Sequence, residues 1–243
     1  MTGQSSLCSA REMMFDRAVH WAGLGAGPIA VAALIWSSWH RGGVIAISVL
    51  IYGASLLAML GCSALYHLSR VAHRKALFRR LDHAAIFLLI AGTYTPFALH
   101  TISGLRGAGL LAFVWAVAVI GIVFKLLRPG VLERVSIVIY VLLGWSGLAM
   151  LGPLQMAASS RTLGLLALGG LFYTVGVLFH VWSRLPYQNA IWHALVLAGA
   201  SCHYAAVVNE VAYSVSWWRS SGRLVVMSDF FTDIPTVQVA ESI

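Results

Sequence analysis

Seven apolar runs dominate the sequence and limit what it can fold into. They cover approximately residues 18–36, 44–66, 84–99, 107–124, 135–153, 162–182 and 190–213. A helix needs about 20 apolar residues to cross the hydrocarbon core of a bilayer, and most of these runs reach that length. Backbone groups in hydrocarbon need partners within the same segment, so each run is predicted to be a helix. The predicted fold is therefore an all-α membrane protein with seven transmembrane helices.

The composition agrees with a chain that is surrounded by lipid. Apolar residues make up 60% of the sequence and charged residues 10%, whereas a soluble domain carries about 25% charged residues. The net charge of +8 does not require a nucleic-acid partner, because membrane proteins retain Lys and Arg on their cytoplasmic side. We expect no nucleic acid among the partners, and the oligomeric state stays open.

The basic residues are distributed unevenly between the two sides of the predicted bundle. Eleven of them fall on the side of the N-terminus: Arg11, Arg17, Arg70, Arg74, Lys75, Arg79, Arg80, Lys125, Arg128, Arg134 and Arg184. Five fall on the other side: Arg41, Arg106, Arg161, Arg219 and Arg223. The positive-inside rule then predicts a cytoplasmic N-terminus, and seven crossings place the C-terminus outside.

The apolar runs also divide the chain. Residues 1–17 are predicted to be a cytoplasmic N-terminal segment, residues 18–213 the seven-helix domain, and residues 214–243 an external tail that could be disordered. The N-terminal segment lacks the pattern of a signal peptide, so the first apolar run is expected to be a span and not a cleaved leader. No function follows for the tail.

Four polar residues share one predicted depth near the cytoplasmic surface. His67 ends the second run, Asp82 opens the third, and Asn189 and His193 open the seventh. A charge at membrane depth usually faces a partner or a wet cavity. Asp is also a favoured residue at helix N-termini, so Asp82 can be a cap, a catalytic group or both.

Other histidines have simpler interpretations. His67 follows Ser63 by four residues, so these two share a helix face. His20, in the stretch "DRAVHWAG", is expected to tie the first span to its neighbours. His180, at the inner end of the sixth run, is a reserve candidate for the same depth as His67.

Long stretches around these residues resemble a known family. They are "DRAVHWAG", "SALYHLSRVAHRKALFRRLDHAAIFLLIAGTYTPFAL", "YVLLGWSGL", "GGLFYTVGVLFH" and "LPYQNAIWHALVLAG". Together they extend from about residue 16 to 205 and resemble the hemolysin III family, the bacterial branch of the progestin and adipoQ (adiponectin) receptor superfamily.

The resemblance implies a seven-helix membrane protein with a zinc site near its cytoplasmic face. The family pattern is Ser-x3-His on the second helix, Asp at the third, and His-x3-His on the seventh. In that pattern the histidines bind zinc and the Asp holds a zinc-bound water. Ser63, His67, Asp82 and His193 match residue by residue, whereas Asn189 stands where the family has a histidine.

The implied chemistry is hydrolysis of an amide or ester. A catalytic zinc keeps one position for water and lowers its pKa to about 7. His67, His193 and a third ligand would hold the metal, Asp82 would orient the water, and Ser63 would stabilise the water or the developing oxyanion. The family's resemblance to membrane amidases and ceramidases suggests a lipid amide as substrate, with zinc as the cofactor and membrane lipid as solvent.

Asn189 leaves three outcomes open. A carboxamide oxygen suits calcium or magnesium better than zinc, so Asn189 could coordinate weakly or through a water. Another inner-side histidine, His180 or His83, could supply the missing imidazole. The third outcome is a chain without metal that acts as a scaffold.

Three kinds of function therefore compete. The first is a zinc-dependent membrane hydrolase, or a sensor of membrane state built on the same core. The second is a membrane-active cytolysin or pore, as the family name suggests, although no span carries the sustained polar stripe of a selective channel. The third is a non-catalytic regulator of membrane homeostasis that has lost the metal site. Family and composition suggest a bacterial inner membrane.

Overall fold

The structure is a computed structural model in which the chain forms helices. It describes residues 2–69, 72–102, 104–128, 130–131, 133–182 and 184–221, and only the backbone of residues 2–9, 72 and 212–221. The elements of this described chain, none of which is a strand, are α1 (Thr2–Ser38), α2 (Gly43–Leu68), α3 (Ala72–Pro96), the π-helical η1 (Phe97–Ile102), α4 (Gly104–Leu127), α5 (Glu133–Trp145), the 3₁₀-helical η2 (Ser146–Met150), α6 (Leu151–Ala157), α7 (Ser160–Val181) and α8 (Gln188–Ser221).

Seven stretches of the described residues are long and apolar enough to cross a membrane. They are Ala10–Ser38, Gly43–Leu68, His73–Ile102, Gly104–Leu127, Glu133–Ala157, Ser160–Val181 and Gln188–Val211. The prediction of an all-α protein with seven helices of membrane-spanning length is confirmed. The third helix begins about three turns before its apolar run, because its first turns hold basic residues that an apolar count leaves out.

The two predicted terminal segments have different outcomes. Residues 2–17 continue the first spanning helix as part of α1, so the helix starts well ahead of the apolar run. At the other end, α8 extends to Ser221. The rest of the predicted external tail, residues 222–243, lies outside the described residues.

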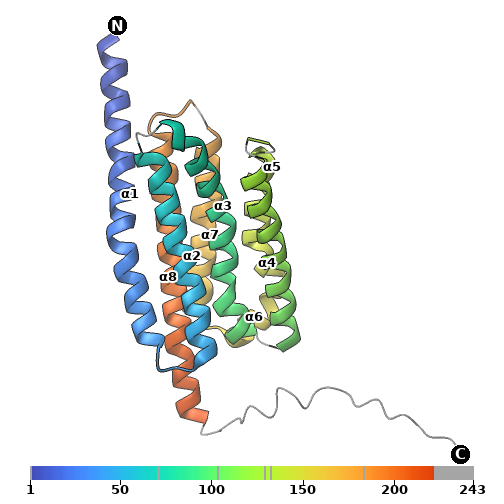
Figure 1. Cartoon of the computed structure of the whole chain (residues 1–243). Helices are drawn as coiled ribbons and strands as arrows, with labels where there is room; N and C mark the ends of the chain where they lie inside the picture. Colours follow the sequence, from blue (N-terminus) through green and yellow to red (C-terminus); the bar gives the residue numbers. More distant parts are fainter. Residues whose placement is uncertain are drawn as a thin grey trace, which may run out of the picture.

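The helices form a closed ring in which the first and last spans are neighbours. α1 packs against α2 and α8, α2 against α3, α3 against α4 and α5, α5 against α7, and α7 against α8 (Figure 1). Helices that follow one another in the chain therefore lie mostly side by side. The α1–α8 contact brings together residues that are about 175 positions apart.

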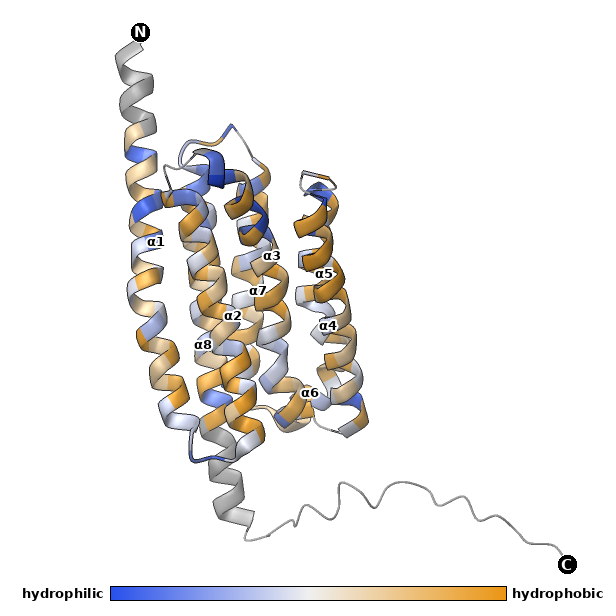
Figure 2. Cartoon of the chain, viewed as in Figure 1, coloured by the Kyte–Doolittle hydropathy of each residue, from blue (hydrophilic) through white to orange (hydrophobic). Residues whose placement is uncertain are grey.

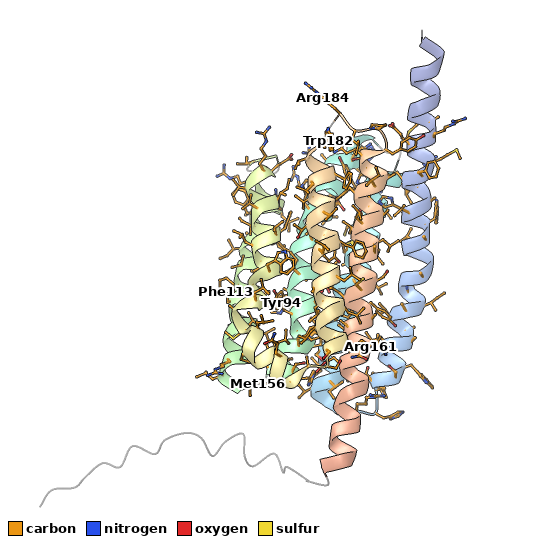
Figure 3. The ribbon with its side chains drawn as sticks, turned by 180° about the vertical axis from the view of Figure 1, so that it is seen from behind. Tyr94, Phe113, Met156, Arg161, Trp182 and Arg184 are labelled. Carbon is orange, nitrogen blue, oxygen red and sulfur yellow. The ribbon has the colours of Figure 1, made fainter. Side chains whose placement is uncertain are left out.

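Hydropathy divides the bundle into two ends and a lipid-facing belt. Hydrophilic residues gather at the end from which α1 projects, where the α2–α3, α4–α5 and α7–α8 connections lie (Figure 2). We call this the basic end, because Arg74, Arg79, Arg128 and Arg184 belong to it. Phe113 and other large apolar side chains point outward from the bundle, as expected for helices in lipid (Figure 3).

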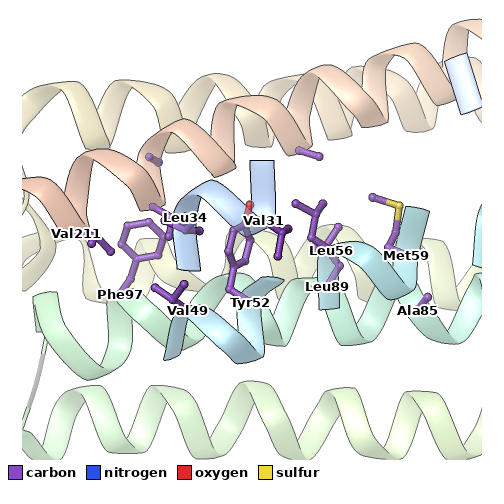
Figure 4. Packing of buried hydrophobic residues seen from close by; sticks show 13 residues of the cluster. Val31, Leu34, Val49, Tyr52, Leu56, Met59, Ala85, Leu89, Phe97 and Val211 are labelled. Atoms are coloured by element: carbon purple, nitrogen blue, oxygen red, sulfur yellow. The ribbon is translucent and has the colours of Figure 1, made fainter. Parts of the chain in front are cut away.

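Two apolar clusters hold the ring together. The larger one joins α1, α2, α3 and α8 around Tyr52, with Leu34, Leu56 and Val207 among its buried members (Figure 4). The second joins α3, α4 and α5 around Phe87. The first cluster fixes α1 against α2 and α8, and this contact positions the site described below.

Glycines allow the closest helix contacts. A Cβ on Gly92 of α3 would lie 2.1 Å from the Ser55 Oγ of α2. A Cβ on Gly169 of α7 would lie 2.3 Å from the His203 ring of α8, and one on Gly199 of α8 would lie 3.1 Å from the Gly169 carbonyl oxygen. Helices in lipid associate by such close packing of small residues, since no hydrophobic force drives them together.

Candidate metal centre

Helix α1 contributes a carboxylate and an imidazole to one face. Asp16 and His20 are four residues apart, so they lie on the same side of the helix. Because α1 packs between α2 and α8, this face turns toward those helices and His20 is buried. The backbone carbonyl of Asp16 accepts a hydrogen bond from the His20 Nδ1–H at 2.8 Å, which fixes the orientation of the ring.

Three imidazole rings from three helices meet at this face. His67 comes from the last turn of α2, and His193 comes from the second turn of α8. The ring centroids of His20 and His193 are 4.5 Å apart, those of His67 and His193 4.3 Å, and those of His20 and His67 5.0 Å. The site therefore joins the first, second and last spans.

The Asp16 carboxylate lies among these rings. Its Oδ1 accepts a hydrogen bond from the His193 Nδ1–H at 2.6 Å. Its Oδ2 is 3.7 Å from the Nδ1 of His67 and 3.9 Å from the Nδ1 of His20. A carboxylate that contacts one imidazole and lies near two more holds all three rings in one small volume.

The hydrogen bonds determine which ring nitrogens are available as ligands. His20 and His193 each donate from Nδ1 to an oxygen of Asp16, so the neutral form of each ring carries its lone pair on Nε2, and the Ser63 hydroxyl lies 3.3 Å from that of His20. Histidines that bind metals commonly have this arrangement, with the other ring N–H donated to a carbonyl or carboxylate. Both rings are thus prepared to bind a cation through Nε2.

Asp16, His20, His67 and His193 can hold a metal ion. Each offers one ligand atom, and the four atoms lie within 4.8 Å of one another. Imidazole nitrogen suits transition metals such as zinc, whereas calcium and magnesium take oxygen ligands almost exclusively. Four donors with three imidazoles among them match the number and kind of ligands that zinc uses, so the donor set fits the cofactor that the family resemblance implies.

The metal-binding group adjoins a large cavity inside the ring. The cavity has a volume of about 380 Å³, and its wall is formed by α2, α3, α4, α5, α7 and α8. His67 and His193 belong both to the group and to this wall. The cavity reaches the surface at the basic end, where two of its lining residues, Arg79 and Glu133, have side chains that are 45% and 38% exposed.

Ser63 and Asp82 connect the group to the cavity. The Ser63 Oγ lies 3.3 Å from the His20 Nε2, and the Ser63 hydroxyl is also a hydrogen-bond partner of the Asp82 carboxylate. Ser63, Asp82, His67 and His193 all line the cavity. The structure therefore brings together the four residues that match the family pattern.

The amide of Asn189 and the two reserve histidines also belong to the cavity wall. Asn189 lines the cavity one helical turn before His193, so its role as a ligand stays a prediction. His180 and His83 also line the cavity outside the group, and the His180 ring packs against Trp192 with centroids 4.9 Å apart. In the part of the chain that the structure describes, the third imidazole beside His67 and His193 comes from α1.

The contribution of α1 is the part of the site that sequence reasoning missed. His20 was expected to connect spans, and Asp16 was assigned no role. One signal was present, since Asp16-x3-His20 repeats the spacing of Ser63-x3-His67 and of Asn189-x3-His193. Spacing alone does not show which helices are neighbours, so the α1 pair could not be joined to the others.

Comparisons with known proteins were made for the whole chain. A family model described as "Haemolysin-III related" matches residues 11–204. The chain is 36% identical over 189 residues to "Hemolysin-3" of Bacillus cereus, covering 78% of this chain and 86% of that protein. It is 36% identical over 183 residues to "Hemolysin-3 homolog" of Bacillus subtilis (strain 168), covering 74% and 85%. It is 29% identical over 183 residues to "Heptahelical transmembrane protein ADIPOR2" of Oryza sativa subsp. japonica, covering 65% and 79%.

Proposed function

The chain belongs to the haemolysin-III-related family of multi-pass membrane proteins, and from that premise we propose that it is a zinc-dependent hydrolase of a lipid amide or ester. One observation carries the proposal: a carboxylate and three imidazoles converge at the wall of a large internal cavity. Structural metal sites are closed by protein ligands, whereas a site beside a cavity can admit water and substrate.

The residues of the site have distinct proposed roles. His20, His67 and His193 would hold zinc, which when bound polarises a substrate oxygen and makes hydroxide available at neutral pH. Asp16 would be the fourth ligand or would orient His193 from outside. The Asp82 carboxylate would accept a proton within the cavity, and Ser63 would hold Asp82 in place through its hydroxyl.

The cavity provides a place for a lipid chain. Apolar side chains from four helices line it, among them Leu89, Ile137, Val177 and Val196. Its volume lies within the range of about 300–1,000 Å³ that is usual for small-molecule sites. We place the basic end in the cytoplasm of a bacterial inner membrane, since most Lys and Arg residues lie at that end.

The metal content of purified variants tests the site. We expect about one zinc per chain in the wild type and a loss of most of it in His20→Ala and in His67→Ala, because each removes an imidazole ligand. His73→Ala is the matched control, since His73 is exposed and outside the group. Elemental analysis of protein purified with limited zinc gives the result.

Two outcomes would contradict the proposed site. If His67→Ala and the wild type contain equal amounts of zinc, the proposed metal centre is wrong. Full zinc in His20→Ala together with loss in His67→Ala would remove His20 from the ligand set and favour Asn189 as the third ligand. Hydrolysis is measured in the same samples as the fatty acid released from lipid amides and esters.

Membrane lysis is the second candidate function. It rests on the names of the two Bacillus relatives. The described part of the cavity wall speaks against a permanent pore, because its residues extend from the basic end to about mid-span, and none belongs to η1 or α6 at the opposite end. A regulator of membrane state that has lost the metal site would bind no zinc and release no product.

A further inference from the structure

One buried cation on the cavity wall has no part in the proposed hydrolysis. Lys125 stands in the last turn of α4, where it lines the cavity and is only 3% exposed. A lysine near the end of a spanning helix ordinarily extends its ammonium group to the water at the membrane surface. Lys125 instead lines the cavity and is hidden from the outer surface, so a ligand in the cavity can reach it.

The protein itself supplies little negative charge for Lys125. Glu133 is the carboxylate that acts on it electrostatically, and Glu133 is already paired with Arg79 at the mouth of the cavity. Within the described residues, no carboxylate forms an ion pair with the Lys125 ammonium. A buried charge is costly unless an anion or several hydrogen-bond acceptors compensate for it.

Further nitrogen groups gather on the same part of the wall. His83 lies within the electrostatic influence of Lys125, Arg79 and His180. The His180 Nδ1 is buried and has no hydrogen-bond partner among the described residues, and the side chains of His83, Lys125, Arg79 and His180 all line the cavity. This part of the wall thus has the two cations Arg79 and Lys125 and two carboxylates, of which Glu133 is paired with Arg79 and Asp82 is a hydrogen-bond partner of Ser63.

We propose that Lys125 and its neighbours bind the anionic head of an amphiphile whose chain lies in the apolar part of the cavity. The head is a phosphate or carboxylate, because a lysine ammonium binds such groups by a strong charge-assisted hydrogen bond. This inference rests on the proposed function, in which the cavity holds a lipid, and it narrows the substrate class to anionic lipids.

The shape of the cavity favours an amphiphile over a free anion. Beyond the polar mouth, the wall continues inward along apolar and aromatic side chains such as Ile90, Trp145 and Val177. A free phosphate would leave that surface without a partner. An alkyl chain attached to the anion would fill it, so both parts of the wall are used by one molecule.

Binding of matched single-chain probes tests this inference. In neutral detergent micelles, hexadecyl phosphate is compared with hexadecyl phosphocholine, hexadecanol and inorganic phosphate, and binding is read from the shift in thermal unfolding at equal mole fractions. We expect hexadecyl phosphate to bind the wild type best, and to bind Lys125→Gln about tenfold or more weakly. Lys125→Arg keeps the charge and retains binding.

The control removes the same charge outside the cavity. Arg128 lies three residues later, is exposed and does not line the cavity, so Arg128→Gln should bind hexadecyl phosphate as the wild type does. Equal binding to the wild type and Lys125→Gln would overturn the proposal. So would tighter binding of hexadecanol or of inorganic phosphate alone than of hexadecyl phosphate.

Two further measurements separate this inference from the proposed hydrolase. Hexadecyl phosphate should protect Lys125, but not the exposed Lys75, from an amine-reactive reagent in wild-type protein, which avoids dependence on a variant that fails to fold. His67→Ala should still bind the probe. If the chain holds no metal but binds the probe through Lys125, the proposed hydrolase is wrong and this inference stands. If the chain hydrolyses lipid but Lys125→Gln binds the probe as the wild type does, this inference is wrong and the hydrolase stands.

Discussion

Asp16 is the residue whose surroundings are most unusual for a spanning helix. Its carboxylate lies 2.6 Å from one imidazole nitrogen and within 4 Å of two others. An ionised carboxylate at membrane depth is costly, and partners of this kind reduce the cost. Asp16 is therefore well placed to hold the positive charge of the site, either as a ligand or through His193.

Replacing Asp16 by asparagine tests this role. Asp16→Asn keeps the size of the side chain and removes its charge, so we expect zinc affinity to fall by about 10- to 100-fold. Competition with a chromophoric chelator measures the change. Glu133→Gln, which removes a carboxylate from the cavity mouth, is the control and should leave zinc affinity unchanged. If Asp16→Asn binds zinc with the affinity of the wild type, Asp16 neither binds the metal nor orients His193.

Single residues of the site were predictable where the helix register determines them. The predicted topology placed His67, Asp82, Asn189 and His193 at one depth, and all four line one cavity. The third imidazole, that of His20, could not be assigned to the site in the same way. It depends on α1 packing between α2 and α8, and this contact arises from side chains such as Leu34 and Val207 rather than from any pattern near His20.

The packing of α7 on α8 depends on small residues where the helices touch. Gly169 and Gly199 face each other so closely that a methyl group on Gly169 would collide with the His203 ring. His203 is itself held by a hydrogen bond from its Nε2 to the Leu166 carbonyl oxygen at 3.3 Å. The ring has little freedom to move aside, so the contact tolerates no added volume.

This contact yields a prediction for stability. Gly169→Ala should lower the free energy of unfolding by about 1–3 kcal/mol, as expected for overpacking in a tight interface. Gly164→Ala in the same helix is the control, because a methyl group there meets no atom within 4 Å and alanine favours the helix. Unfolding in mixed micelles compares the two. If Gly169→Ala is as stable as Gly164→Ala, the α7–α8 spacing is looser than the structure has it.

Helices were more predictable than their limits. Each apolar run gave one span because hydrocarbon permits no other local structure. The starts of α1 and α3 were not apparent, since both begin in polar sequence that an apolar count excludes. The π-helical turn η1 directly after Pro96 also has no signal in apolarity.

The whole molecule closes its ring around a cavity that ends near mid-span. Among the described residues, those that line the cavity reach from the basic end to about mid-span, so a cavity of this extent would not carry ions across. We therefore expect liposomes that contain the protein to retain an entrapped dye as well as protein-free liposomes do. A pore-forming peptide serves as the positive control. The result would favour lysis over hydrolysis if dye release rises with the amount of protein and persists in His67→Ala.

The meeting of α1 and α8 also has a consequence for how the protein is made. The chain enters the membrane from its N-terminus, so Asp16, His20 and His67 are in place long before His193 leaves the ribosome. An incomplete chain holds two imidazoles and a carboxylate but cannot complete the ligand set. Metal loading would then mark the moment when the last helix docks, and a chain truncated before α8 would reach the membrane without acquiring a finished centre.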